Sequence, residues 1–194
     1  MRIISGTLAG RRIPFNNKLF GNARVTTDFV KEALFGSLGP DLTSLRMLDI
    51  FTGSGQIGLE AVSRGTTAWM NDRDRKRVAF IRGLIDEWDL RDQITLTGFD
   101  WEQLLAHLGD SGDRFDLIYI DPPYDAVTLD GILVAEASLQ DVARRGLLSD
   151  NGRLFVQHDK RTDLPPSAED LVLKRSRRYG DSHLSRYEPS SDQG

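Results

Sequence analysis

Cysteine is absent from the 194 residues of this chain. Without thiols there are no disulfides, no thiolate metal sites and no cysteine nucleophile, which excludes methylation of a pyrimidine ring carbon through a cysteine adduct. No apolar run approaches the roughly 18 residues that span a membrane, and the first residues lack the apolar core of a signal peptide. The three histidines are scattered, without the spacing of metal ligands. We therefore expect a soluble cytoplasmic protein without a metal.

Acidic residues slightly outnumber basic ones, and the net charge is −4. The charges are unevenly distributed, because basic residues crowd the first 31 positions and recur at Lys174, Arg175, Arg177 and Arg178. Basic ends on an acidic body can form one patch that binds phosphates. The alternative is solvated charge without a partner.

Apolar runs alternate with amphipathic segments through most of the chain, which predicts a parallel sheet covered by helices on both faces. The expected strands are 47–50, 67–71, 93–97, 115–120 and 153–157, with final strands at 171–174 and 183–187. The expected helices are 29–38, 56–64, 73–88, 101–108 and 129–144. Residues 1–22 predict a short basic hairpin or arm, and the polar end from Glu188 predicts a frayed tail.

A glycine pattern, Gly53-x-Gly55-x-x-Gly58, lies between the first expected strand and a helix. Glycines let the backbone approach a ligand, and the first amides of the helix point at it. Asp49 precedes the glycines and would repel a pyrophosphate, whereas it would attract the sulfonium or amino group of S-adenosylmethionine. Asp72, after the next strand, can accept both ribose hydroxyls, as in nicotinamide and S-adenosylmethionine sites alike. A glycine turn without a ligand is the alternative.

The most specific motif is Asp121-Pro122-Pro123-Tyr124, at the end of the fourth expected strand. Ligands of open α/β sheets bind at this edge. The prolines fix φ and lack amide donors, so the Asp121 carboxylate and the Pro122 carbonyl can accept the two hydrogens of a planar amine. Tyr124 offers an aromatic face for the base. A rigid turn with an exposed tyrosine is the alternative.

The order of these motifs resembles that of S-adenosylmethionine-dependent amino-methyltransferases, and a closer resemblance to the RsmD family covers nearly the whole chain. The matching segments are Arg2-Ile3-Ile4-x-Gly6, Gly10-Arg11-Arg12, Thr26-Thr27-Asp28, Lys31-Glu32-Ala33-Leu34-Phe35, Gly53-Ser54-Gly55-x-x-Gly58-Leu59-Glu60-Ala61-x-Ser63-Arg64-Gly65 and Tyr179-Gly180-Asp181-x-x-Leu184. Three positions depart from the family: Ser5 replaces its usual Gly, Val25 its Pro and Phe29 its Arg. The missing arginine concerns an RNA contact and leaves the chemistry unaffected.

The resemblance implies a Rossmann-like class I methyltransferase fold, with a mostly parallel sheet of seven strands and the last strand antiparallel. It implies a small N-terminal extension (residues 1–40), a methyltransferase domain (41–188) and a short tail (189–194). The implied reaction is methylation of the N2 amine of one guanine in 16S ribosomal RNA, with S-adenosylmethionine as cofactor. The implied partner is a partly assembled small ribosomal subunit, and a monomer is the default expectation.

The resemblance also assigns residues to three groups. The cofactor group is Asp49, Phe51, Gly53, Ser54, Gly55, Gly58, Asp72, Phe99 and Asp100. The group that handles the target base is Asp121, Pro122, Pro123 and Tyr124. The RNA-binding group is Arg2, Arg11, Arg12, Arg24, Thr26, Thr27, Lys31, Arg177, Arg178 and Tyr179.

Three other functions compete with this one. The Asp-Pro-Pro-Tyr chemistry alone also suits methylation of adenine N6 in DNA or RNA, or of a glutamine amide in a protein. An NAD-dependent oxidoreductase would explain the glycines and Asp72, but neither Asp49 nor Asp-Pro-Pro-Tyr. A non-catalytic ribosome-assembly protein would leave both motifs without a purpose.

Overall fold

The computed structural model of this protein describes residues 1–16, 20 and 28–190. The predicted RNA contacts at Arg24, Thr26 and Thr27 and the tail residues 191–194 lie outside this part of the chain. The chain divides into two compact units, Met1–Trp101 and Glu102–Gly194, and we describe each by itself. The predicted domain boundary near residue 40 stays a prediction.

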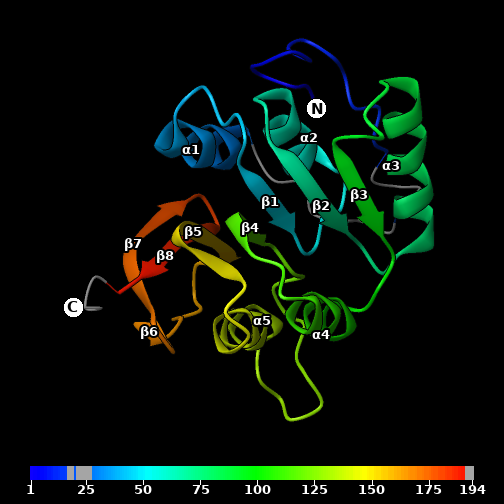
Figure 1. The fold of residues 1–194 in the computed structure, drawn as a ribbon. Helices are drawn as coiled ribbons and strands as arrows, with labels where there is room; N and C mark the ends of the chain where they lie inside the picture. Colours follow the sequence, from blue (N-terminus) through cyan, green and yellow to red (C-terminus); the bar gives the residue numbers. More distant parts are fainter. Residues whose placement is uncertain (17–19, 21–27, 191–194) are drawn as a thin grey trace. The chain divides into compact units, whose positions relative to one another are not determined.

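The first unit is built from β-α-β crossovers, as the alternating sequence pattern predicts. Its parallel strands are β1 (Arg46–Asp49), β2 (Thr67–Asn71) and β3 (Ile94–Thr97), in the spatial order β3-β2-β1. Its helices are α1 (Asp28–Leu38), α2 (Gln56–Ser63) and α3 (Arg75–Glu87). Because right-handed crossovers step twice in the same direction, α2 and α3 cover the same face of these strands; Figure 1 shows α3 alongside β3.

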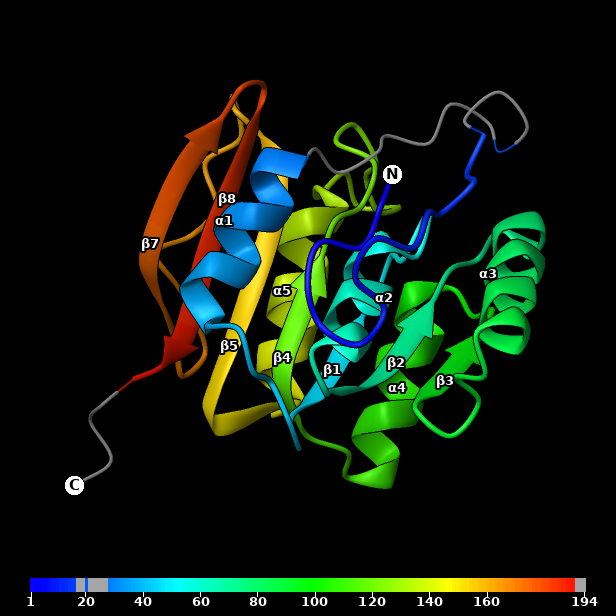
Figure 2. The same ribbon diagram turned by 90° about the horizontal axis from the view of Figure 1, so that it is seen from above.

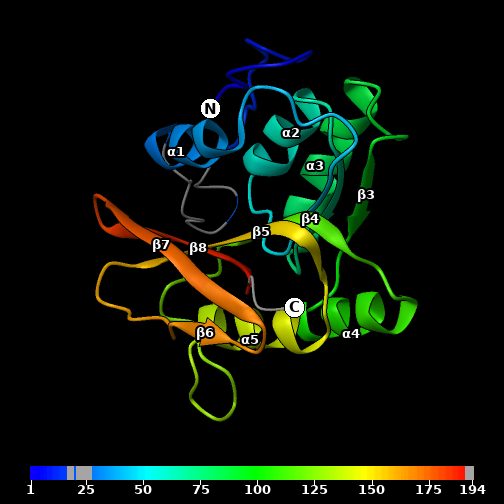
Figure 3. The same ribbon diagram turned by 60° about the vertical axis from the view of Figure 1, so that its left-hand side comes forward.

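The second unit contains the other strands and two helices. The helices are α4 (Trp101–Ser111) and α5 (Val134–Arg144). The strands are β4 (Phe115–Ile120), β5 (Leu148–Asp159), β6 (Ser167–Ala168), β7 (Leu171–Tyr179) and β8 (Ser182–Pro189). β4 pairs with β5 in parallel, whereas β8 runs antiparallel to both β5 and β7. The predicted antiparallel last strand is therefore confirmed. The two-residue β6 adds a strand to the seven expected. Figure 3 shows the β7–β8 hairpin beside β5.

Several predicted bounds are wrong. The helix expected from 129 begins at Val134, because Thr128 N bonds to the Ile132 carbonyl oxygen at 2.8 Å and closes a turn through Gly131 at φ +80°. Helix α4 continues to Ser111, past the expected end at residue 108. The hairpin strands are longer than predicted, and β8 extends to Pro189, past the expected start of the frayed tail.

The predicted N-terminal hairpin is confirmed for residues 1–13. Ile3 N donates to the Arg11 oxygen, Gly10 N donates to the Ile3 oxygen, and Ile13 N donates to the Met1 oxygen, each at 2.9–3.0 Å. The hairpin binds to α2 through Glu60, whose fully buried carboxylate accepts from Ile4 N at 2.7 Å and from Ser5 N at 3.1 Å. Figure 2 shows the first residues lying next to α2.

The third glycine of the turn motif, Gly58, lets α2 pack closely against β2. A Cβ added at Gly58 would lie 2.7 Å from the Met70 sulfur and 2.8 Å from Met70 Cγ, and Met70 is fully buried. Because Cγ is close to the strand backbone, the methionine cannot move aside cheaply. Close helix–strand packing thus requires glycine here, as it does for the third glycine of dinucleotide-binding turns.

We predict that Gly58→Ala destabilises the protein by about 1–3 kcal/mol, because the added methyl overpacks the contact with Met70. The matched control is Gly83→Ala in the interior of α3, where an added Cβ meets no atom within 4 Å. The control is expected to gain about 0.5–1 kcal/mol from helix propensity. Urea unfolding of both variants measures the difference, and equal stability of the two would contradict the packing role of Gly58.

Candidate active site

The glycine turn of the first unit has the geometry of a ligand cradle. Gly53 and Gly55 adopt positive φ values of 55° and 79°, and Gly55 is the N-cap residue of α2 without a side-chain cap bond. A Cβ added at Gly53 would meet only the Phe51 oxygen, at 3.9 Å. The backbone at Gly53 is therefore open to a ligand, and the first amides of α2 favour negative or electron-rich groups.

The structure places the Asp72 carboxylate against this turn. Its Oδ2 accepts from Gly53 N at 3.0 Å and from Arg77 Nη1 at 3.4 Å, and its Oδ1 accepts from Asp74 N at 2.9 Å. A carboxylate has about four acceptor sites. Binding to two ribose hydroxyls therefore requires the Arg77 bond, the longest of the three, to give way.

Asp49 is buried next to the turn, and its side chain is 1 % exposed. Its Oδ2 accepts from Thr52 Oγ1 at 2.9 Å, while Thr52 N donates to the Asn71 carbonyl oxygen at 2.8 Å. The acid thus sits at the C-terminal end of β1 with its orientation fixed. Of the other predicted cofactor residues, Phe51 is half-buried, Ser54 is buried, and Phe99 and Asp100 are exposed on the segment after β3.

Asn71 is a site-forming residue that the sequence analysis missed. Its buried amide donates to the carbonyl oxygens of Ile50 (3.2 Å) and Phe99 (3.0 Å), and it accepts from Phe99 N and Thr97 Oγ1, both at 2.9 Å. One side chain therefore joins the C-terminal ends of all three strands of this unit and places Phe99. The only sequence signal was a polar residue at the end of an apolar strand.

The second unit holds the Asp121-Pro122-Pro123-Tyr124 motif directly after β4. Pro122 is buried, Asp121 and Tyr124 are half-buried, and Ala126 N donates to the Pro123 oxygen at 3.0 Å to close the turn. The Tyr119 hydroxyl lies 3.4 Å from Asp121 Oδ2 and donates to Gln157 Oε1 at 2.7 Å. Gln157 Nε2 in turn donates to the Tyr124 hydroxyl at 3.0 Å. Tyr119 and Gln157 carry no sequence signal for this role, since only the strand register reveals their proximity to the motif.

The β7–β8 turn is connected to this motif. The Tyr124 and Ser182 hydroxyls lie 2.5 Å apart. Lys160 donates to Asp181 at 2.6 Å, and this hydrogen bond lowers the pKa of the Asp181 carboxyl from its ordinary value. The predicted RNA-binding residues Arg177 and Arg178 are exposed on β7, and Tyr179 is half-buried.

The predicted RNA contacts of the first unit divide into two groups. Arg2, Arg11 and Arg12 are exposed on the N-terminal hairpin, where the Arg11 guanidinium lies 5.3 Å from the centre of the Trp88 ring. Lys31 is instead completely buried, with Nζ 2.6 Å from the Arg2 carbonyl oxygen and 4.0 Å from Glu60. Its prediction as an RNA contact is wrong, because its charge holds the hairpin and α1 together inside the fold.

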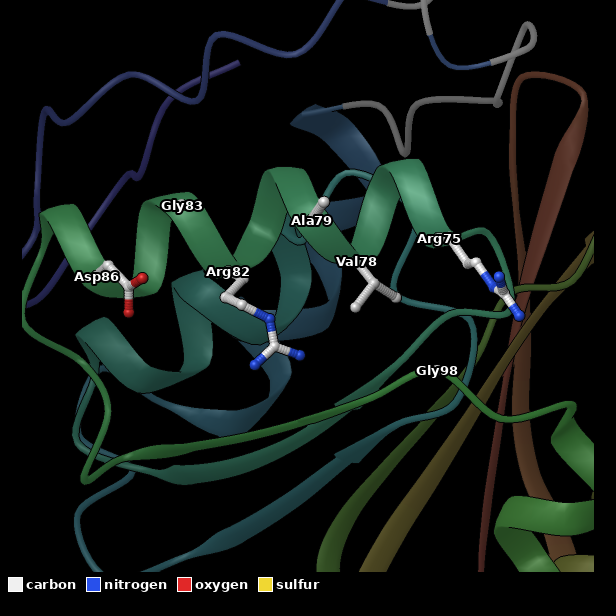
Figure 4. Close-up of a pocket in the computed structure, with 7 residues that line it drawn as sticks. All are labelled: Arg75, Val78, Ala79, Arg82, Gly83, Asp86 and Gly98. Atoms are coloured by element: carbon white, nitrogen blue, oxygen red, sulfur yellow. The ribbon is translucent and has the colours of Figure 1, made fainter.

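A pocket of about 470 Å³ lies along α3, but it contains none of the predicted site residues. Figure 4 shows its lining, Arg75, Val78, Ala79, Arg82, Gly83, Asp86 and Gly98.

Within the described ranges, no group of three or more His, Asp or Glu residues could hold a metal ion. No helix in these ranges has the length and apolar character needed to cross a membrane.

Comparison with known proteins assigns the fold to the methyltransferases. A solved putative methyltransferase of Escherichia coli superposes with a TM-score of 0.79 at 25% identity, covering 99% of both chains. The mostly parallel sheet with an antiparallel last strand is the Rossmann-like class I arrangement.

Sequence comparison then gives the family. The family model described as conserved hypothetical protein 95 matches residues 1–188, and the chain belongs to this family, the RsmD family. The putative rRNA methyltransferase YlbH of Bacillus subtilis is 33% identical over 93% of this chain and 94% of its own length. The ribosomal RNA small subunit methyltransferase D of Escherichia coli K12 is 28% identical over 93% of this chain and 85% of its own.

Proposed function

We propose that this protein transfers a methyl group from S-adenosylmethionine to the N2 amine of one guanine in 16S ribosomal RNA. Methylation of ribosomal RNA is the activity in the names of the two curated relatives, over nearly the whole length of this chain. The observation that carries the proposal is the Asp-Pro-Pro-Tyr motif after β4, whose Tyr124 hydroxyl accepts from Gln157 and whose Asp121 carboxylate lies 3.4 Å from the Tyr119 hydroxyl.

The residues of the first unit fit S-adenosylmethionine. The open backbone at Gly53 and the uncapped start of α2 suit a ligand that lies against main chain. Asp49 carries the negative charge that attracts the cationic methionine end, and Asp72 accepts from the ribose. Phe99 offers an exposed ring for the adenine, and Asp100 can accept from its amine. When bound, the cofactor supplies a methyl group on a sulfonium, already activated for transfer to an amine.

The residues of the second unit suit an exocyclic amine. The Asp121 carboxylate and the Pro122 carbonyl accept its two hydrogens, which directs the nitrogen lone pair toward the electrophile, while Tyr124 stacks on the base. Orientation of this kind is worth about 7–11 kcal/mol in favourable cases. Asp121 also stabilises the positive charge that develops on nitrogen. The surplus proton passes to Asp121 or to water.

The exposed arginines indicate how the RNA is held. Arg2, Arg11 and Arg12 in one unit and Arg177 and Arg178 in the other provide five cations for phosphates. Side chains cannot reach guanine N2 inside a paired stack without distortion, so the base is bound exposed or flipped. We propose a partly assembled small subunit as substrate, and a monomeric enzyme.

We predict that S-adenosylmethionine stabilises the protein against heat and that NAD does not. At a hundredfold excess over Kd, one site adds about 2.7 kcal/mol. A thermal-shift assay with both ligands measures this. Stabilisation by NAD alone would favour the oxidoreductase, because a pyrophosphate must then be tolerated beside Asp49.

We predict that Asp121→Ala retains S-adenosylmethionine binding and loses at least about a hundredfold in methyl transfer, since the charge on nitrogen loses its stabilising partner. Asp125→Ala is the matched control, because it removes an exposed acid from the same loop. Transfer of labelled methyl to RNA gives the rates, and calorimetry gives cofactor affinity. Full activity of Asp121→Ala would refute the assignment.

We predict that replacing Arg11, Arg12, Arg177 and Arg178 by alanine weakens RNA binding and reduces its dependence on salt. Each lost phosphate contact lowers the slope of log K against log salt by about 0.7 on single-stranded RNA. The control replaces Arg91 and Arg144, which are exposed and paired with Asp86 and Asp141. If the quadruple variant kept the wild-type slope, these four arginines would have no role in RNA binding.

A further inference from the structure

Four side chains of the second unit form a continuous hydrogen-bond chain. It runs from Tyr119 to Gln157 (2.7 Å), from Gln157 to Tyr124 (3.0 Å) and from Tyr124 to Ser182 (2.5 Å). Asp121 Oδ2 lies at its beginning, 3.4 Å from the Tyr119 hydroxyl. The chain therefore contacts both polar side chains of the Asp-Pro-Pro-Tyr motif.

Strand register places these residues on one face of the sheet. Tyr119 of β4 is the partner of Phe155 of β5, and Gln157 lies two residues beyond Phe155 on the same face. Gln157 is the partner of Leu184 of β8, two residues beyond Ser182. Three strands thus contribute one residue each, while Tyr124 enters from the loop after β4.

Gln157 is the centre of this chain, because its amide is both acceptor and donor. It is 4 % exposed, and Tyr119 is 2 % exposed, so neither hydroxyl nor amide can exchange its partner for bulk water without cost. A phenol has one hydrogen to donate. The shorter bond to Gln157 uses it, which turns the Tyr119 hydrogen away from Asp121.

We propose that Gln157 is a positioning residue for methyl transfer. By accepting from Tyr119 it draws the phenol hydrogen away from Asp121, so that no second donor competes for the charge of the carboxylate that faces the substrate amine. By donating to Tyr124 it fixes the ring against which the base stacks. The proposal rests on the proposed function and adds to it a residue outside the motif.

The same hydrogen-bond chain connects the Asp-Pro-Pro-Tyr motif to the β7–β8 hairpin. Ser182 follows the β7–β8 turn, whose position is also fixed by the bonds from Lys160 N and Nζ to Asp181 at 3.0 and 2.6 Å. Arg177 and Arg178 lie on the strand that enters this turn. RNA that binds to Arg177 and Arg178 would thereby take a defined position relative to Tyr124.

The test uses the full chain with Gln157→Leu, Tyr119→Phe and the double variant. In Gln157→Leu the phenol hydrogen of Tyr119 turns to Asp121 and competes with the amine. We expect kcat to fall by about ten- to a hundredfold, with KM for RNA and cofactor affinity within about threefold of wild type. The double variant is expected to be no slower than Gln157→Leu, because the competing phenol is gone.

Tyr187→Phe is the matched control. Its hydroxyl is also buried and also donates over 2.7 Å, but to the Pro165 carbonyl oxygen on the opposite face. It should lower the denaturation midpoint about as much as Tyr119→Phe, while kcat stays at the wild-type value. If Gln157→Leu reduces kcat no more than Tyr187→Phe does, the positioning role is wrong.

A measurement that does not depend on activity separates this proposal from the proposed function. The Ala126 amide closes the Asp-Pro-Pro-Tyr turn, and its hydrogen exchange should be faster in Gln157→Leu than in wild type or Tyr187→Phe. Unchanged exchange in Gln157→Leu overturns the positioning proposal, whatever the activity. Faster exchange combined with a wild-type protein that methylates no RNA would overturn the proposed function alone.

Discussion

The hydrogen bond from Gly53 N to the Asp72 carboxylate, at 3.0 Å, fixes the turn after β1 against the end of β2. The start of α2 and the strand ends of the first unit are arranged around this bond. The turn sets where α2 begins, and the contact of Gly58 with Met70 sets how closely that helix packs on the strand. Asn71 then joins the ends of β1, β2 and β3. A backbone open to a ligand is thus supported by hydrogen bonds from the side chains of Asp72 and Asn71.

In the second unit, the Asp-Pro-Pro-Tyr motif is likewise contacted by polar side chains of neighbouring strands. This motif, which we propose to bind the substrate, follows the buried strand β4. Gln157 accepts from Tyr119 and donates to Tyr124, and the Tyr124 hydroxyl is also bonded to Ser182 on the hairpin that carries exposed arginines. Because orientation is the main contribution that the proposed methylation of an amine requires, the proposal gives this support a part in catalysis.

The sequence predicted those parts of the fold that rest on local pattern. Strands 67–71 and 115–120 were predicted with the bounds that the structure has, because turn signals flank their apolar runs. The start of α5 was wrong, since Leu129 and Ile132 continue an apolar spacing in a loop where both are exposed. Strands β7 and β8 were predicted too short, because β7 carries charged residues on both faces and shows no alternation.

The motifs of the candidate site were also visible in the sequence, but their supports were not. Asn71, Tyr119 and Gln157 form hydrogen bonds to residues of neighbouring strands or of the segments that follow them. The amino-acid sequence does not specify which strands pair or in which register. Lys31 was assigned to RNA from its charge, whereas its burial with Glu60 follows from how α1 and the hairpin meet α2. Charge alone does not distinguish a surface cation from one that neutralises a buried carboxylate.

Labelled methyl transfer to ribosomal RNA from cells that lack this protein, followed by nucleoside analysis, tests the central claim most directly. The account predicts that the label appears in small-subunit RNA as N2-methylguanine. Label in N6-methyladenine, label in protein, or no transfer at all with the folded, cofactor-bound enzyme would contradict it.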